Sequence, residues 1–304
     1  MNDFKAIILA AGQGKRMRTR LPKVLHPLYE SNLLEFLLDT IKSVFGESYI
    51  LVVSPKIKEL ISDNDHIVVQ EAPLGTGDAI KKAEEKLGDF NGNLVIFPGD
   101  VPLIEERTII DLCREHMEKN NDCTLVTTFL EDPKGYGRVV RDLNGNVLKI
   151  VEEKDASEEE KNIKEINTSI YVFKWIYLKE VLPLLSNNNA QGEFYLTDAI
   201  KYIIEKGKKV GVFHVNKEEV LGANTQEELA ILRKILKNRI NKRHMENGVI
   251  MIEPENIVIG KRTNIEHDAI IYPFSFIFGD INIKEGTIIG PYSYININKR
   301  IKGE

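Results

Sequence analysis

An unbroken six-residue repeat late in the chain is the strongest constraint on its fold. Seven isoleucines follow one another at this interval: Ile259, Ile265, Ile271, Ile277, Ile283, Ile289 and Ile295. A period of six fits neither an α-helix nor an isolated amphipathic strand, but it is typical of a hexapeptide β-helix, in which one apolar side chain per face points inward. Because a triangular coil takes about three hexapeptides, the repeat predicts a stub of about two coils.

The first 130 residues alternate apolar strands with amphipathic helices. Strands are expected at 6–11, 49–53, 66–70, 93–97 and 123–128, and helices at 31–45 (capped by Ser31), 75–87 and about 105–119. This alternation predicts an α/β fold, with a mixed, mostly parallel sheet and helices on both faces. Ligands of such sheets bind beyond the carboxyl ends of the strands, so the loops after the first and fourth strands should meet at the site.

The middle of the chain has a different pattern. Residues 137–154 form two strand-like runs around Asn144-Gly145, a strong hairpin signal, and further strands are expected at 166–173 and 209–215 with a helix over 193–206 between them. We interpret this part as a lobe on the sugar or substrate side of the site, inserted into the same domain. Thr225 and Glu228 have the spacing of a capping box for a helix that ends near Gly248.

Composition excludes several classes of protein. The 304 residues are 42% hydrophobic and 29% charged, as in ordinary globular proteins, and the net charge of -5 argues against a general binder of nucleic acid or membrane surfaces. The two cysteines form no CxxC pair, which suits a reducing cytosol and gives no metal-site signal. No stretch is long enough to span a bilayer. We therefore expect a soluble, cytoplasmic protein with no nucleic-acid or membrane partner.

A glycine loop follows the first strand. Gly12 and Gly14 break the apolar run, and Lys15, Arg16 and Lys23 belong to the basic cluster that comes next. Glycines let backbone N–H groups approach an anion closely. The loop is neither a dinucleotide fingerprint nor a P-loop. The alternative is a solvated basic surface with no ligand, but the position of the cluster directly after a strand-ending loop favours a phosphate site.

Three further positions carry polar groups to the same edge of the predicted sheet. Asp100, in PGDVPL, is either a turn-forming residue or a ligand for Mg2+, which prefers oxygen atoms and shares substrate phosphates. Gln70 ends the third strand and has an amide suited to reading a base edge. The second glycine loop, LGTGDA (74–79), opens a helix and serves either polar ligand atoms or simple capping.

Several segments occur in an order that resembles the sugar-nucleotide pyrophosphorylases. They are LAAGQGKRM, LPKVLHPL, GDVPLI, DPKGYGRVV, IVEEKDA, EINTSI, NNNAQGEFYLTD and GANTQEEL. Within that group the chain looks like the bacterial N-acetylglucosamine-1-phosphate uridyltransferases, which are usually fused to a glucosamine-1-phosphate acetyltransferase. The resemblance implies a Rossmann-like nucleotidyltransferase (pyrophosphorylase) domain over 1–226, a linker helix over 227–248 and a truncated left-handed hexapeptide β-helix over 249–304.

The resemblance also implies roles for individual residues. The nucleotide would contact Leu9, Ala10, Ala11 and Gly12 through the loop backbone, and Gln70, Gly75 and Thr76 at the base and ribose. Arg16 and Lys23 would be catalytic and bind the phosphates. Asp100 and Asn224 would hold Mg2+, and the sugar would contact Gly137, Glu152, Asn167 and Asn224. The chain departs from the family pattern at Lys15, Pro98, 29–32 and Ser169, none of which is an assigned functional position.

The function that the resemblance implies is Mg2+-dependent transfer of UMP from UTP to N-acetylglucosamine 1-phosphate, with release of pyrophosphate, for cell-envelope precursors. A homotrimer held weakly by the stub is expected. The alternatives are a nucleotidyltransferase for another sugar 1-phosphate, and a non-catalytic regulatory subunit, which would be expected to lose Lys23 or Asp100. An RNA-binding module is disfavoured by the acidic balance. Because the later coils are absent from this sequence, no acetyltransferase activity is expected, and His267 and Lys284 read as solvated corner residues.

Overall fold

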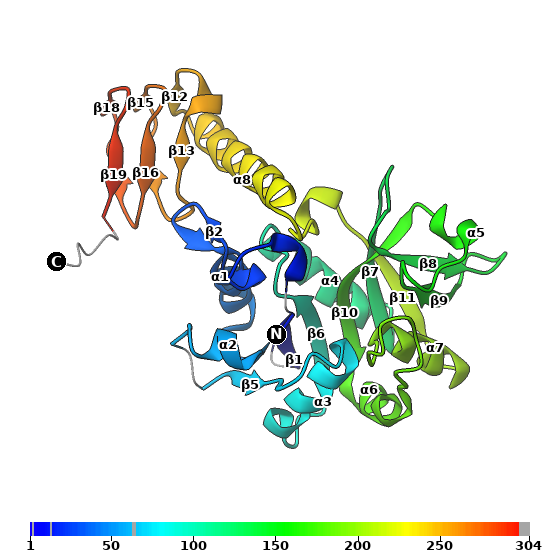
Figure 1. The fold of residues 1–304 in the computed structure, drawn as a ribbon. Helices are drawn as coiled ribbons and strands as arrows, with labels where there is room; N and C mark the ends of the chain where they lie inside the picture. Colours follow the sequence, from blue (N-terminus) through cyan, green and yellow to red (C-terminus); the bar gives the residue numbers. More distant parts are fainter. Residues whose placement is uncertain (2, 13, 63–64, 298–304) are drawn as a thin grey trace. The chain divides into compact units, whose positions relative to one another are not determined.

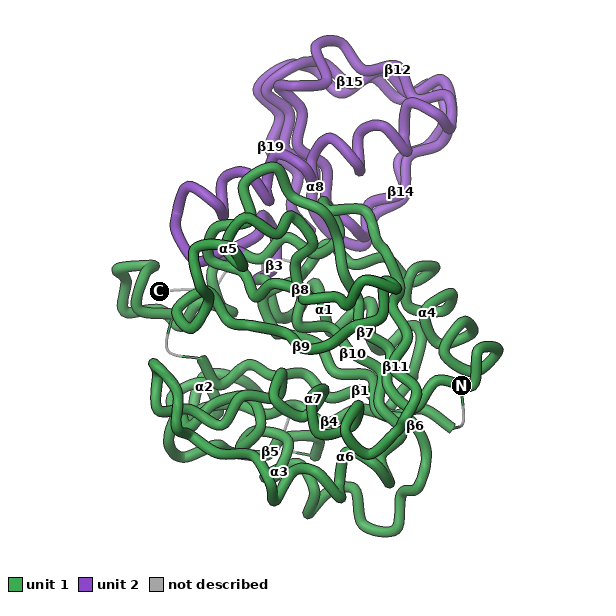
Figure 2. The backbone as a smooth tube through the Cα atoms, turned by 90° about the vertical axis from the view of Figure 1, so that its right-hand side faces the viewer, with its two compact units in different colours: residues 1–26, 33–222 green, residues 27–32, 223–304 purple. Residues whose placement is uncertain are grey.

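A computed structural model describes residues 1, 3–12, 14–62 and 65–297. The chain divides into two compact units, drawn in different colours in Figure 2. The first comprises residues 1–26 and 33–222, and the second comprises residues 27–32 and 223–304. In the described part of the chain, no helix is both long and apolar enough to cross a membrane.

A nine-stranded mixed sheet forms the centre of the first unit (Figure 1). Its main path runs β11-β7-β10-β6-β1-β4-β5, and the hairpin β8–β9 joins through β10. Strands β5, β4, β1 and β6 are mutually parallel, as are β11 and β7, whereas β10 runs antiparallel to both of its neighbours on the path. The strands are β1 Phe4–Ala10, β4 Tyr49–Val53, β5 Ile67–Val69, β6 Asn93–Pro98, β7 Cys123–Phe129, β8 Gly137–Arg141, β9 Val147–Val151, β10 Glu165–Lys174 and β11 Val210–His214. The mixed, mostly parallel sheet expected from the sequence is confirmed.

Helices cover both faces of this sheet, as expected. The helices of the first unit are α1 Leu33–Phe45, α2 Pro55–Lys58, α3 Thr76–Leu87, α4 Glu106–Glu118, α5 Glu158–Lys161, α6 Trp175–Val181 and α7 Thr197–Glu205. Because successive strand residues point to opposite faces, Ile8 of β1 belongs to the core cluster shared with α1 and α4, and Ile7 belongs to the cluster shared with α3, α6 and α7. Full burial of both faces explains why these strands are nearly continuous apolar runs.

Two helix starts differ from the sequence prediction. Helix α1 begins at Leu33 rather than directly after Ser31, since Ser31–Asn32 forms a short strand, β3, paired with β2, Pro27–Leu28. The helix expected over 193–206 begins only at Thr197. Residues 194 and 196 instead use their backbone N–H groups in hydrogen bonds to the segment 74–76. Contacts distant in sequence have overridden local helix preference there.

The second unit contains the long helix α8, Gln226–Glu246, and the repeat region (Figure 1). Thr225 caps the helix through a bond from the Glu228 N–H (3.1 Å) to its hydroxyl, but the Glu228 carboxylate accepts from the N–H of Asn224 rather than of Thr225, so the reciprocal box is displaced by one residue. The strands that follow are β12 Ile250–Met251, β13 Val258–Ile259, β14 Asn264–Ile265, β15 Ile270–Ile271, β16 Phe276–Phe278, β17 Asn282–Ile283, β18 Ile288–Ile289 and β19 Tyr294–Asn296.

The repeat folds as its period predicts. Ile259 pairs with Ile277, Ile265 with Ile283, and Ile271 with Ile289, always in parallel and eighteen positions apart. Three hexapeptides therefore complete one coil, and the strands stack into three short sheets, β12-β15-β18, β13-β16-β19 and β14-β17. The first six isoleucines of the series are buried. The short hexapeptide β-helix expected from the sequence is confirmed.

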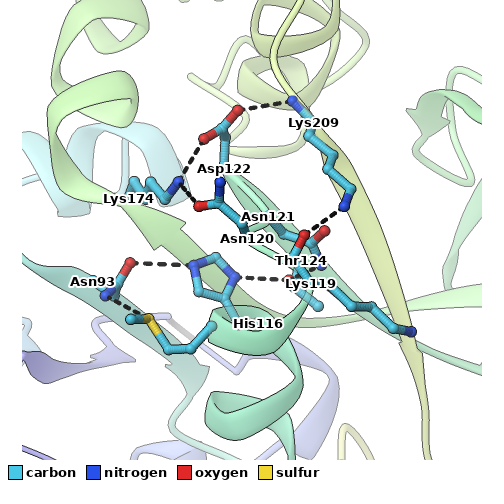
Figure 3. Close-up of polar contacts among 10 residues, drawn as sticks. Asn93, His116, Lys119, Asn120, Asn121, Asp122, Thr124, Lys174 and Lys209 are labelled. Carbon is cyan, nitrogen blue, oxygen red and sulfur yellow. Dashed lines mark hydrogen bonds and ion pairs between the residues drawn. The ribbon is translucent and has the colours of Figure 1, made fainter.

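A buried polar network joins α4 to strands β6 and β7 (Figure 3). His116 is fully buried, with Nδ1 2.8 Å from the Thr124 hydroxyl and Nε2 3.2 Å from Asn93 Oδ1. Asn93 Oδ1 is an acceptor, and Thr124 already accepts a bond from the Asn121 amide, so the network fits a neutral ring protonated on Nε2. Burial, followed by the nearby Lys174, lowers the pKa of His116 to about 4.

Candidate active site

The first glycine loop and the PGD loop lie side by side at the carboxyl edge of the sheet. Leu9 is in register with Pro98, and the Gly99 N–H donates to the Leu9 carbonyl at 2.9 Å. A Cβ atom on Gly99 would stand 2.9 Å from Ala10 Cβ, closer than real Cβ contacts, so this approach requires glycine. Gly12 is exposed, and a Cβ there would meet nothing within 4 Å. Gly12, two residues after Ala10, therefore faces open space.

Two short turns hold the basic residues of the predicted phosphate site. Gly14 adopts φ +60°, and a Cβ on it would lie 2.6 Å from Lys23 Cβ, so the glycine lets the two turns approach. Arg16 is exposed on the first turn, Lys15–Met17. The Lys23 ammonium forms an ion pair and hydrogen bond with Asp100 Oδ2, and both side chains are about one-sixth exposed. The predicted phosphate ligand and the predicted metal ligand are thus direct neighbours.

Gln70 is held in one orientation. Its side chain is 5% exposed, and Nε2 donates to the Gly75 carbonyl at 3.0 Å and to Asp78 Oδ2 at 2.8 Å. Both partners are acceptors only, so the amide nitrogen must face them, and Oε1 is left as the acceptor for a ligand. Sequence reasoning missed Asp78. Its only signal was an acidic residue in the first turn of the helix that follows the glycine loop.

Three of the four residues assigned to the sugar, Gly137, Glu152 and Asn167, come together on strands β8 and β10 and at the end of β9. Asn167 is in register with Gly137, where β8 pairs with β10. A Cβ on Gly137 would lie 3.5 Å from Glu152 Oε2. The amide of Asn167 donates to the Tyr171 hydroxyl at 2.6 Å, across an irregularity in the pairing of β10 with β7. A carboxylate, an amide and a glycine backbone therefore share one small region.

Glu152 has an electrostatic environment typical of a ligand-binding carboxylate. Burial raises its pKa above the usual glutamate value, and the nearby carboxylates of Asp198, Asp155 and Glu193 act in the same direction. The Thr197 hydroxyl donates to Glu152 Oε1 at 3.1 Å, which opposes this rise. A buried carboxylate with few donors gains most from a ligand that brings N–H or O–H groups.

Comparison with known proteins assigns the fold to a family. The family model described as nucleotidyl transferase matches residues 5–222. The chain belongs to the nucleotidyl transferase family. It is 42% identical over 294 residues to the protein named Bifunctional protein GlmU from Thermoanaerobacter pseudethanolicus, covering 96% of this chain and 64% of that protein. It is 45% identical over 305 residues to the protein of the same name from Acetivibrio thermocellus, covering 99% and 66%.

The chain therefore spans about two thirds of the length of these relatives. Together, the family model and the relatives show that it is a nucleotidyltransferase. Every predicted site residue except Asn224 falls within the matched range. Asn224 belongs to the second unit. There its backbone N–H donates to the Glu228 carboxylate at 2.6 Å.

The loop that follows β6 offers one carboxylate, that of Asp100, to a divalent cation. Among the residues that the structure describes, no group of three or more His, Cys, Asp or Glu side chains is arranged to hold a metal. Mg2+ commonly takes one or two carboxylates, with substrate phosphates and water completing its shell. Asp100 fits that requirement, and a cation there would share its carboxylate with Lys23.

The two residues singled out in the β-helix belong to a surface network. His267 Nδ1 lies 2.8 Å from Asp268 Oδ2, and this neighbour raises the pKa of the imidazole. Lys284 pairs with Glu266 at 2.9 Å. The side chains of His267, Asp268 and Lys284 are largely solvated, and that of Glu266 is 30% exposed. Exposed pairs of this kind contribute little to stability.

Proposed function

We propose that this nucleotidyltransferase transfers UMP from UTP to N-acetylglucosamine 1-phosphate and releases pyrophosphate. The observation that carries the proposal is the fixed amide of Gln70, which presents an acceptor to a base, in the same unit as the Gly137, Glu152 and Asn167 cluster. The first feature selects a base with a matching donor. The second supplies groups suited to a sugar that carries an amide.

Base choice follows from the direction of the Gln70 amide. Uracil has a donor N–H at ring position 3, and cytosine has an acceptor nitrogen at the same position. The Oε1 acceptor of Gln70 pairs with the first and repels the second. Since Nε2 is engaged by Gly75 and Asp78, the amide cannot reverse without losing both hydrogen bonds. The arrangement therefore supports a uridine nucleotide over a cytidine nucleotide.

The Glu152 cluster supports an N-acetylated sugar. A partly buried carboxylate accepts hydrogen bonds from an acetamido N–H or a ring hydroxyl, and Asn167 offers both a donor and an acceptor. Because the pKa of Glu152 is raised by burial, a donor from the sugar also favours the charged form. We assign the acetamido group to this cluster.

The chemistry needs no general base. A phosphate monoester has its second pKa near ~6, so the acceptor is substantially a dianion at neutral pH. The residues must align the two phosphates and offset their repulsion. Arg16 and Lys23 would stabilise the charge on the α-phosphate and the departing pyrophosphate. Asp100 would hold Mg2+, which when bound neutralises phosphate charge.

Association into a homotrimer through the β-helix is part of the proposal. Aromatic side chains on the coils are exposed, among them Tyr272, Phe274, Phe276, Tyr292 and Tyr294. Phe274 stacks on Tyr292 with ring centroids 5.1 Å apart, so these two exposed rings form a joint apolar surface. Such a face favours a protein contact.

Pyrophosphate release with a panel of substrates tests the proposal. UTP, CTP, ATP and GTP are each paired with N-acetylglucosamine 1-phosphate, glucosamine 1-phosphate and glucose 1-phosphate. The expected result is a kcat/KM highest for UTP with the N-acetylated sugar. A clear preference for another base or sugar would overturn the assignment while leaving the nucleotidyltransferase class intact.

A further inference from the structure

A short segment that leads into α7 lies directly against the second glycine loop. We call residues Glu193–Thr197 the strap. The Phe194 N–H donates to the Leu74 carbonyl at 2.7 Å, and the Gly77 N–H donates to the Phe194 carbonyl at 2.8 Å. The Leu196 N–H donates to the Thr76 hydroxyl oxygen at 2.9 Å. Three hydrogen bonds therefore join the strap to the loop that carries Gly75 and Thr76.

The two glycines of this loop are explained by the strap. Gly75 adopts φ +106°, and a Cβ on it would lie 2.6 Å from the Phe194 carbonyl oxygen. A Cβ on Gly77 would lie 3.0 Å from the same oxygen and 2.5 Å from a methyl of Leu185. Any side chain at either position would push the strap away. The loop is thus built to receive the Phe194 backbone.

The other end of the strap holds the carboxylate assigned to the sugar. The Thr197 hydroxyl donates to Glu152 Oε1 at 3.1 Å. Two residues earlier, the Tyr195 hydroxyl donates to Asp155 Oδ2 at 3.3 Å. Asp155 closes the turn after Glu152 through a bond from its N–H to the Glu152 carbonyl at 3.0 Å. Tyr195, Leu196 and Thr197 are all buried, so the strap connects the two regions as a packed element.

We infer that the strap couples the base subsite to the sugar subsite, so that each ligand raises affinity for the other. The inference rests on the proposed function, because it uses the substrate assignments of Gln70, Gly75 and Thr76 on one side and of Glu152 on the other. A nucleoside that fixes the loop also fixes the strap, and the Thr197 hydroxyl then holds Glu152 in place before the sugar arrives. The conformational entropy of the strap is lost when the first ligand binds, so the second ligand binds more tightly. The same gain applies whichever ligand binds first. Thr76 and Thr197 act as positioning residues.

Two ligand fragments measure the coupling without contact between substrate phosphates. The probes are UMP and free N-acetylglucosamine, titrated calorimetrically alone and in each other's presence. For the unmodified protein, bound UMP should raise affinity for the sugar by about fivefold or more, the lower end of measured couplings. Thr76→Val and Thr197→Val should reduce the factor to near one, and Thr76→Ser and Thr197→Ser, which keep the hydroxyl, should restore it. Because the factor is a ratio, a direct loss of sugar affinity in a variant cancels.

The outcomes separate this inference from the proposed function. If both fragments bind and the valine variants keep the full factor, or if the unmodified protein shows none, the coupling is refuted and the proposed function stands. If the unmodified protein binds neither fragment at the highest soluble concentrations, that result would count against the proposed function itself. Thr76 is exposed whereas Thr197 is buried, so Thr76→Val is the less disruptive variant and carries the test if Thr197→Val unfolds, with a thermal midpoint measured for each variant.

Discussion

Removing the Asp78 carboxylate should lower the preference for UTP over CTP, although Asp78 bonds to Gln70 and is not proposed to contact the base. Asp78 holds one hydrogen of the Gln70 amide, and the Gly75 carbonyl holds the other. In Asp78→Ala only the hydrogen bond to the Gly75 carbonyl still holds the amide in that orientation. The free-energy cost of reversing the Gln70 amide is therefore lower, and the reversed amide can donate a hydrogen bond from Nε2 to the ring nitrogen of cytosine.

The hydrogen bonds set the magnitude. A bond to a neutral carbonyl contributes about 0.5–1.5 kcal/mol and one to a charged group about 1.5–3 kcal/mol. Reversal in the unmodified protein therefore costs roughly 2–4.5 kcal/mol, or roughly 30- to 2,000-fold in selectivity at 1.4 kcal/mol per tenfold. Loss of the Asp78 share should lower the preference for UTP over CTP by roughly ten- to a hundredfold.

The assay is kcat/KM for pyrophosphate release with UTP, CTP and 5-methyl-UTP. The methylated base keeps the donor at ring position 3, so its ratio to UTP should not change in Asp78→Ala. Asp78→Asn replaces the charged acceptor by a neutral amide, whose bond is weaker and which can also donate to a reversed Gln70 amide, so its selectivity should lie between those of Asp78→Ala and the unmodified protein. An unchanged UTP-to-CTP ratio in Asp78→Ala would refute the role of the amide direction.

Three further predictions follow from other parts of the first unit. Asp100→Ala should lower kcat by roughly 10²–10³ at saturating Mg2+ with the thermal midpoint little changed; near-normal turnover would exclude Asp100 as the metal ligand. Gly75→Ala should cost about 1–3 kcal/mol of stability through backbone strain, whereas Gly12→Ala, with open space around it, should keep stability and raise the KM for UTP; equal stability losses in chemical denaturation would contradict this. His116 takes up a proton near ~6.5 when unfolded but only at about 4 when folded, so stability should be full above that window and fall by roughly 3 kcal/mol as the pH drops through it. His116→Gln should flatten that part of the stability curve, and an identical slope in both proteins would show that His116 does not cause it.

Patterns with a short period predicted most of the fold. The isoleucine spacing gave both the β-helix and its coil length, because one inward residue per hexapeptide is the whole core of such a coil. The apolar runs predicted the sheet for the same reason: a strand buried on both faces has no polar face to interrupt it. The glycine loop and the PGD loop came together because their strands are parallel neighbours.

Contacts between distant segments were beyond the reach of these patterns. The strap was predicted as part of a helix, since nothing within 193–197 reveals that its backbone bonds to residues 74–77. Asp78 looked like an ordinary first-turn acid, and its bond to Gln70 depends on the loop geometry between them. Gly75 was read as a ligand-facing glycine, and the structure supplies a second reason for it in Phe194.

Phosphorus NMR of a mixture of UTP, N-acetylglucosamine 1-phosphate, Mg2+ and the protein tests the central claim most directly. The proposal predicts that the sugar phosphate and triphosphate signals decline together while a sugar diphosphate and pyrophosphate appear in equal amounts. Omission of the sugar phosphate should leave the UTP signals unchanged. Orthophosphate as the product, or loss of UTP without a matching diphosphate ester, would contradict the transfer of UMP to the sugar phosphate.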